Sequence, residues 1–115
     1  MPSELYYPSG AASLVTDVTK TGSLATPNYV GIWTPAVGKR IVLFGFSVGA
    51  RTVVANCGTS LAIGGVDFIL VNTPTQTPVT INFENGLHIF GVNDVLQIDV
   101  NVAVAVTYAV WGTEI

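Results

Sequence analysis

Charge is what this sequence has least of, and positive charge above all. Only 10% of its 115 residues are charged, with four Lys or Arg against seven Asp or Glu, and the formal net charge is −3. Average soluble domains carry about 25% charged residues. Nucleic-acid binding needs a surplus of positive charge, so the composition argues against DNA or RNA as a partner. Because half of the residues are apolar, we expect much of the surface to be covered by a partner.

The chain contains one cysteine and one histidine, which removes several classes of site. Cys57 has no second cysteine to pair with, so we interpret it as a small buried apolar residue. Metal sites need three or four converging ligands, and His88 belongs to no short-spaced zinc or calcium motif. No serine lies in a nucleophile-elbow pattern, and the glycines between Gly45 and Gly49 lie inside a predicted strand and do not precede a helix. We therefore predict that the protein is not an enzyme and holds neither a metal nor a cofactor.

Long apolar runs and a leader are also missing. No run of about 18 to 20 apolar residues predicts a membrane span, and residues 1–8 lack the basic and apolar regions of a secretory signal. We expect no membrane partner, and a chain that stays in the cytoplasm where it is made or leaves it by lysis. The length suits one domain. Two prolines and a glycine within residues 1–10 predict an irregular N-terminal arm, followed by a single domain over residues 11–115.

What the sequence does have is the pattern of an all-β protein. Val, Ile, Thr and aromatic residues are frequent, and turn residues recur about every ten positions, which is typical of a β-sandwich or barrel. The pairs Gly64-Gly65 and Asn85-Gly86 predict tight turns, and residues 19–28 are predicted as a loop. Strands before the C-terminal tract are predicted over residues 12–18, 29–33, 39–49, 51–56, 66–71, 79–83 and 87–90.

The strand predicted over residues 39–49 has two distinct faces, because successive side chains of a strand point to opposite sides. We expect the large residues of one face to enter the core: Val42, Phe44, Phe46 and Val48. The other face begins apolar and then becomes small, which indicates that something approaches it closely. Its residues are Ile41, Leu43, Gly45, Ser47 and Gly49.

The C-terminal tract over residues 96–110 has the most regular pattern in the chain. Every second residue is apolar, which predicts a core-facing strand face: Leu96, Ile98, Val100, Val102, Val104, Val106, Tyr108 and Val110. A single strand of this length would span about 50 Å at about 3.3 Å per residue, too long for so small a domain. We therefore predict a break near residues 101–104.

The other face of this tract becomes small and neutral toward its end, at Ala103, Ala105, Thr107 and Ala109. A solvent-exposed row of this kind, without charges, favours aggregation. Two explanations remain open: the row is buried against a symmetry-related copy, or a second sheet of the same subunit lies over it.

The aromatic residues also admit two interpretations. Tyr6, Tyr7, Tyr29, Trp33 and Trp111 are the residue types that form a stacking platform for a sugar. They are equally suited to packing in the core and at interfaces, which is the interpretation we prefer.

Three segments resemble small virion proteins of tailed bacteriophages. They are Trp33-Thr34-Pro35-Ala36-Val37-Gly38-Lys39-Arg40-Ile41-Val42-Leu43, the turn Asn85-Gly86-Leu87 and the terminal strand over residues 108–114. In such proteins a Trp-x-Pro-x-x-Gly-Lys-type entry precedes a core strand, a Gly-Leu turn precedes another, and the last strand ends near an acidic residue, here Glu114. The resemblance covers residues 29–115 and leaves the first 28 residues unmatched.

The resemblance implies a jelly-roll-like antiparallel β-sandwich, commonly trimeric, that sits on the capsid surface of a virion as a decoration or cement protein. The major capsid protein would then be its partner. Similar sandwiches also serve as carbohydrate- or receptor-binding modules of phage tails and fibres, which is the alternative. We expect the arm to touch the capsid or a neighbour, and residues 102–111 to help form a homotrimer interface. The predicted interface residues are Tyr6, Tyr7, Ala103, Ala105, Thr107, Ala109 and Trp111.

Overall fold

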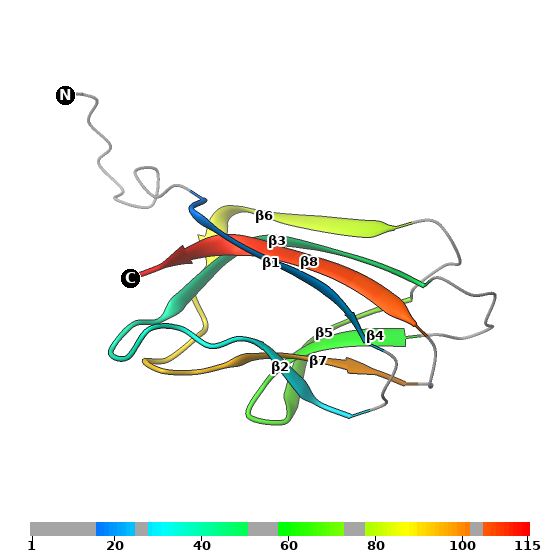
Figure 1. The fold of residues 1–115 in the computed structure, drawn as a ribbon. Coiled ribbons are helices and arrows are strands. Elements are labelled where there is room, and N and C mark those ends of the chain that lie inside the picture. Colours follow the sequence, from blue (N-terminus) through cyan, green and yellow to red (C-terminus); the bar gives the residue numbers. More distant parts are fainter. Residues whose placement is uncertain (1–15, 25–27, 51–57, 73–77, 102–104) are drawn as a thin grey trace.

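The computed structural model describes residues 16–24, 28–50, 58–72, 78–101 and 105–115 (Figure 1). The strands in these ranges are β1 (Val18–Leu24), β2 (Val30–Trp33), β3 (Ile41–Ala50), β4 (Gly58–Ile63), β5 (Val66–Asn72), β6 (Val79–Leu87), β7 (Leu96–Val100) and β8 (Val106–Glu114). No helix occurs in the described ranges.

The strands form two four-stranded antiparallel sheets that pack face to face (Figure 1). One sheet has the order β1-β8-β3-β6 and the other β2-β7-β4-β5. Strand pairs β1–β8, β2–β7, β3–β6 and β4–β5 thus alternate between the two sheets. This is the winding of a jelly roll, in which an antiparallel ribbon is rolled into a sandwich. The predicted all-β, jelly-roll-like sandwich in a single domain is confirmed.

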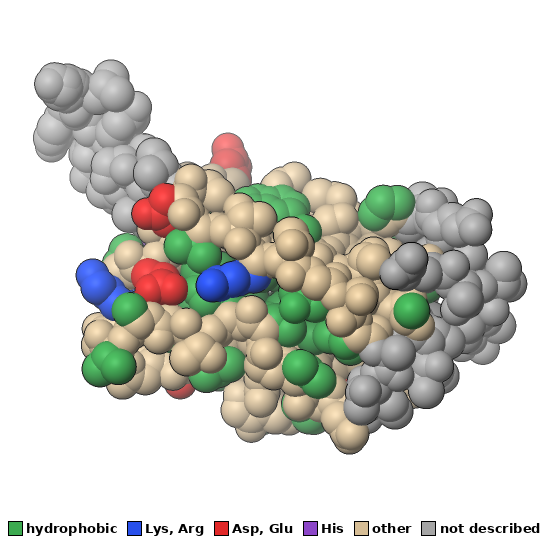
Figure 2. All heavy atoms as spheres, in the orientation of Figure 1, with side chains coloured by type: hydrophobic (Ala, Val, Ile, Leu, Met, Phe, Trp, Pro, Cys, Tyr) green, Lys and Arg blue, Asp and Glu red, His purple; other side chains and the backbone are tan. Residues whose placement is uncertain are grey.

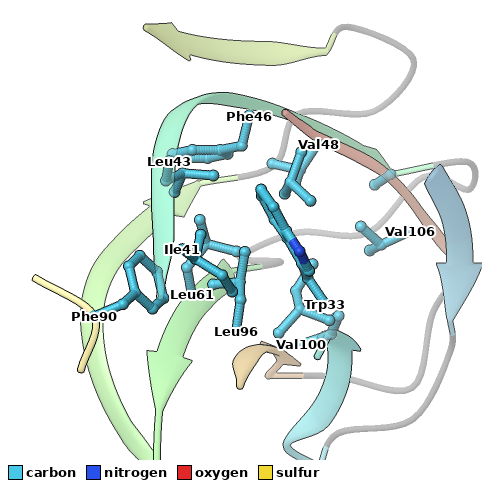
Figure 3. Packing of buried hydrophobic residues seen from close by; sticks show 13 residues of the cluster. Trp33, Ile41, Leu43, Phe46, Val48, Leu61, Phe90, Leu96, Val100 and Val106 are labelled. Atoms are coloured by element: carbon cyan, nitrogen blue, oxygen red, sulfur yellow. The ribbon is translucent and has the colours of Figure 1, made fainter. Parts of the chain in front are cut away.

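The core lies between the two sheets (Figure 3). Its largest members come from both layers, with Trp33 and Leu96 from one sheet and Phe46 and Val106 from the other, each almost fully buried. Each such side chain contributes about 1.5 to 3 kcal/mol by leaving water. Aromatic contacts add to this packing, since the rings of Phe68 and Phe90 meet edge to face with their centroids 5.8 Å apart.

A β-bulge in β3 overturns part of the predicted face pattern. Leu43 pairs with Gly112 of β8, but Gly45 pairs with Trp111, so Phe44 is an extra residue in the ladder. The alternation shifts by one position there. The core-facing residues are Ile41 and Leu43 before the bulge and Phe46, Val48 and Ala50 after it. The prediction was therefore right for Phe46 and Val48 and wrong for Phe44, which is only half-buried. Val42 is fully buried, as predicted, but lies outside the cluster between the sheets.

The pair Asn85-Gly86 does not form the predicted hairpin turn. β6 continues through both residues to Leu87, and residues 88–90 are not a strand. The register against β3 moves from Gly45–Asn82 to Leu43–Leu87, so Gly86, with a φ of 81°, lies in an irregular, bulged part of the strand. A glycine with positive φ serves bulges as well as turns. The Gly64-Gly65 turn, in contrast, is confirmed as the hairpin between β4 and β5, with φ values of 59° and 76°.

Two further strand predictions need correction. β1 occupies much of the segment predicted as a loop, and it pairs with β8 from Val18–Gly112 to Leu24–Val106. As an edge strand it buries little, so its sequence lacks a strong apolar alternation. β4 was not predicted because nearly all of its residues are buried on both faces, which removes the alternation as well. The strand predicted over residues 51–56 and residues 12–15 of that over 12–18 lie outside the described residues, and Val18 is the first residue of β1.

The predicted break in the C-terminal tract is confirmed. β7 ends at Val100 and β8 begins at Val106. The two strands belong to different sheets, so the chain must cross from one layer to the other between them.

Candidate functional site

The outer side of the β1-β8-β3-β6 sheet is the candidate interaction surface, here called the β8 face. The register places Thr107, Ala109 and Trp111 of β8 in the same rows as three residues of β3 and three of β1. Thr80 and Asn82 of β6 extend two of these rows. The β8 face consists of Thr19, Thr21, Ser23, Gly45, Ser47, Gly49, Thr80, Asn82, Thr107, Ala109 and Trp111, none of which is charged. Glu84, two positions after Asn82 in β6, is a charged residue on the same side of the sheet, beyond these rows.

The second sheet does not cover this face. Val106 and Val110 of β8 belong to the buried cluster between the sheets, so the residues that alternate with them point away from it. Thr107 is exposed, and Ala109 and Trp111 are half-buried. Of the two explanations left open by the sequence, an overlying sheet of the same subunit is therefore wrong for these three residues.

The predicted interface residues are only partly brought together. Thr107, Ala109 and Trp111 lie on the same side of β8. Ala105 is half-buried and lies just before that strand. Tyr6, Tyr7 and Ala103 lie outside the described residues, as does the N-terminal arm over residues 1–10.

The β8 face carries an aromatic ring and a shallow hollow. Trp111 lies over Gly45, where a Cβ atom would come within 2.6 Å of the indole Cζ2. A shallow hollow of about 190 Å³ lies beside it, lined by Ser47, Gly49, Pro78, Thr107, Tyr108 and Ala109. Sites for small molecules usually measure about 300 to 1,000 Å³, so this hollow suits a single side chain of a partner better than a cofactor.

Charged side chains gather elsewhere. In the view of Figure 2 they lie mostly toward the end of the molecule that holds the C-terminus, and the middle of the visible face is neutral. Lys20, Lys39, Arg40 and Glu114 belong to this end, where the first residues of β1 and β3 pair with the last residues of β8. A partner that docks on the β8 face therefore meets few charges that would need desolvation.

The start of β3, the residues before it and the end of β8 meet at this charged end. The indole Nε1 of Trp33 donates to Oε2 of Glu114 at 2.8 Å, and the backbone N–H of Ala36 donates to Oε1 at 3.0 Å. Backbone hydrogen bonds between Arg40 and Ile115, both 2.9 Å long, close the same junction. The sequence analysis singled out Trp33 and Glu114 separately. It could not predict their hydrogen bond, because 81 positions separate the two residues in the chain. These residues act as a structural latch between the two sheets.

The Glu114 carboxylate gives the latch a pH dependence. Its pKa is lowered from the usual value, first by the hydrogen bond from Trp33, then by that from Ala36 and by the charges of Lys20 and Lys39, while burial opposes the shift. A lowered pKa stabilises the fold above the unfolded-state value, about 4.3, and this stabilisation is lost as the pH falls through the folded-state value.

Glu114→Gln is therefore expected to cost about 1 kcal/mol of unfolding free energy at neutral pH, allowing for solvent screening of a partly exposed group. The cost should shrink as the pH falls through the lowered folded-state pKa of Glu114, where the wild-type carboxyl becomes protonated. Urea unfolding across this pH range measures it. Glu84→Gln, at an exposed position of β6, is the matched control; equal, pH-independent losses in both variants would contradict the latch.

The aromatic platform that the sequence admitted as an alternative is not formed by the described residues. Trp33 is only 1% exposed and belongs to the core, whereas Tyr29 is 42% exposed. Tyr29 precedes β2, at the edge of one sheet, and Trp111 lies on the outer face of the other sheet. The Tyr29 hydroxyl donates to Asp67 at 2.8 Å. Its pKa is raised by this hydrogen bond, by desolvation and by the charges of Asp67 and Asp99.

No converging set of reactive groups is found in the described ranges. No group of three or more His, Cys, Asp or Glu residues lies close enough there to hold a metal ion. His88 is exposed, with Nε2 3.1 Å from the carbonyl oxygen of Asn85. Cys57 lies outside the described residues. No helix in this part of the chain is long and apolar enough to cross a membrane.

No protein-family model and no curated protein matches this chain. The candidate surface is a neutral face of small residues held on a frame of two packed sheets.

Proposed function

We propose that this protein is a non-enzymatic structural component of a tailed-phage virion that decorates and cements the capsid surface as a homo-oligomer, namely a homotrimer. The observation that carries the proposal is the uncharged β8 face, left open by the second sheet. The eight-stranded jelly roll is compatible with it, since this architecture recurs in viral capsid domains and also in lectins.

The composition of the β8 face favours burial in an assembly. Faces that stay in water normally carry charged residues that prevent association, and the rows through Thr107, Ala109 and Trp111 have none, since Glu84 of β6 lies beyond them. The small side chains of the face let a partner approach closely, and the half-buried ring of Trp111 is the kind of aromatic anchor that dominates interface energetics. In a cyclic trimer the β8 face of one copy would pack against a different, complementary surface of the next copy, and the three contacts close into a ring.

A cement protein acts through thermodynamic linkage. It binds the assembled shell more tightly than free shell subunits and so stabilises the shell by mass action. Contact with the major capsid protein is assigned to the N-terminal arm over residues 1–10. The mechanism needs a rigid frame but no reactive group.

The oligomer is tested with Ala109→Arg, which places a long cation in the middle of the β8 face. We expect the wild-type protein to have the mass of three copies, or of a multiple of three, in light scattering at micromolar concentration, and the variant to have the mass of two copies at most. Val92→Arg, at a 48% exposed position outside the strands, should leave the mass unchanged. A monomeric wild type would contradict the proposal.

The cementing role is tested on capsid shells. Added wild-type protein should raise the temperature at which shells disassemble, and a variant lacking residues 1–10 should not bind them. Unchanged binding after this deletion would contradict the role of the arm. Binding to a glycan array, abolished by Tyr29→Ala and without any effect on shells, would instead support the carbohydrate-binding alternative.

A further inference from the structure

The fold leaves four strands at sheet edges, β1 and β6 in one sheet and β2 and β5 in the other. Unpaired edge N–H and C=O groups bind other strands, and proteins usually protect them with charges, bulges or short length. β1 carries Lys20 and is almost entirely exposed and polar. β6 is irregular at Gly86 and carries Glu84. β2 has only four residues and a register shift after Gly31.

β5 (Val66–Asn72) lacks comparable protection. Four apolar residues, 68–71, follow one another, and its only charge is Asp67 near the start. The register against β4 is irregular around Phe68, but from Leu61–Ile69 to Gly58–Asn72 it is regular. The second half of β5 is thus a straight apolar edge.

The side chain of Leu70 is the exposed centre of this edge. It is 69% exposed, and it lies on the outer side of the sheet, where its Cδ1 would be 3.3 Å from a Cβ atom at Gly58. Its neighbours Ile69 and Val71 point the other way and pack against the core cluster. The edge therefore offers both backbone hydrogen-bonding groups and a large apolar side chain.

We propose that β5 pairs antiparallel with β5 of a second copy, about a twofold axis at Leu70, and joins two four-stranded sheets into one of eight strands. Side chains directly opposite each other must lie on the same side of a sheet. With Leu70 opposite Leu70 of the second copy, Ile69 lies opposite Val71, and both continue the core-facing layer. A shift by one residue would place Leu70 opposite an inward-facing residue, so the face pattern excludes odd shifts. Among the even registers, this one places the two exposed Leu70 side chains against each other, where both leave water.

Charge also favours a second copy as the occupant. Residues 68–72 carry no charge. The charges of a charged partner strand would therefore have no opposite charge on β5 to pair with. In the self-paired register the two Asp67 residues are each three positions from the axis, on opposite sides of it. Six positions correspond to about 20 Å, beyond the screening length of about 8 to 10 Å. Two identical strand edges can therefore pair without placing the two Asp67 carboxylates near each other.

This contact is separate from the proposed virion role and does not depend on it. β5 belongs to one sheet and the β8 face to the other, so both contacts fit on one subunit at the same time. If both form, the β5 contact links neighbouring β8-face oligomers to each other.

Disulfide cross-linking tests the register directly. In a Cys57→Ser background, Leu70→Cys places two thiols opposite each other, where Cβ atoms of paired residues lie about 4.5 to 5.5 Å apart. We expect a covalent dimer on a non-reducing gel after mild oxidation. Val66→Cys in the same background is the matched control, because Val66 is also 69% exposed but lies four positions from the axis. No dimer from Leu70→Cys, or equal dimer from both variants, would overturn the pairing.

Sedimentation equilibrium tests the energetics. Leu70→Lys places two cations directly opposite each other and should raise the dissociation constant of this contact at least about tenfold, whereas Val66→Lys should leave it unchanged. Ala109→Arg, which disrupts the β8 face, should leave the Leu70→Cys cross-link intact. Loss of that cross-link in the Ala109→Arg variant, or a Leu70→Lys protein that associates like the wild type, would contradict an independent β5 contact.

Discussion

Replacing Gly112 with alanine is expected to prevent folding, or to cost at least about 3 kcal/mol of unfolding free energy. Gly112 lies in β8 between Val18 of β1 and Leu43 of β3. A Cβ atom there would overlap the carbonyl oxygen of Val42 and come within 3.2 Å of the Cα of Leu43. Both obstacles are backbone atoms, which cannot rotate away, so β8 and β3 would have to separate. Circular dichroism and urea unfolding measure the loss.

Gly49→Ala is the matched control for this prediction. Gly49 is also a strand glycine, but a Cβ there would meet Pro78 at 3.4 Å, an ordinary contact. We expect its stability to stay within about 0.5 kcal/mol of the wild type. A Gly112→Ala protein that unfolds at the same urea concentration as Gly49→Ala would show that the sheet yields at this point, contrary to the steric argument.

The bulge beside Gly112 also explains why the sequence predicted the faces of β3 only in part. The alternation from Val42 to Val48 looks uninterrupted in the sequence, yet Phe44 is an extra residue because Leu43 and Gly45 pair with adjacent residues of β8. A bulge is a property of two strands together, so the pattern of one strand cannot reveal it. The break between β7 and β8 could be predicted, because it follows from the length of a single strand.

The candidate surface was predictable to a similar degree. The period of two places Thr107, Ala109 and Trp111 on one side of β8 without any structure. Whether that side is open depends on which layer packs against β8, and this is decided by residues far away in the sequence. The same holds for Leu70, whose exposure follows from the edge position of β5. The apolar pattern of β5 would be the same whether the strand lay at the edge of a sheet or in its middle, so the sequence alone does not predict the exposure of Leu70.

Truncating Trp33 should produce the second large loss of stability. The side chain is 1% exposed, and it reaches from β2 in one sheet to Glu114 of β8 in the other. Trp33→Ala should cost about 3 to 5 kcal/mol, close to the whole stability of many domains, about 5 to 15 kcal/mol. Trp33→Phe keeps most of the ring volume but removes the N–H group, so we expect a smaller loss of about 1 to 3 kcal/mol.

A double-mutant cycle separates the packing of Trp33 from its hydrogen bond. If the Nε1 to Oε2 contact of 2.8 Å stabilises the latch, the losses in Trp33→Phe and Glu114→Gln should not add. The double variant should then be more stable than the sum predicts, by about 0.5 to 2 kcal/mol in urea unfolding. Losses that add to within about 0.3 kcal/mol would mean that Trp33 acts through packing alone. In that case Trp33 and Glu114 would stabilise this end of the sandwich independently of each other.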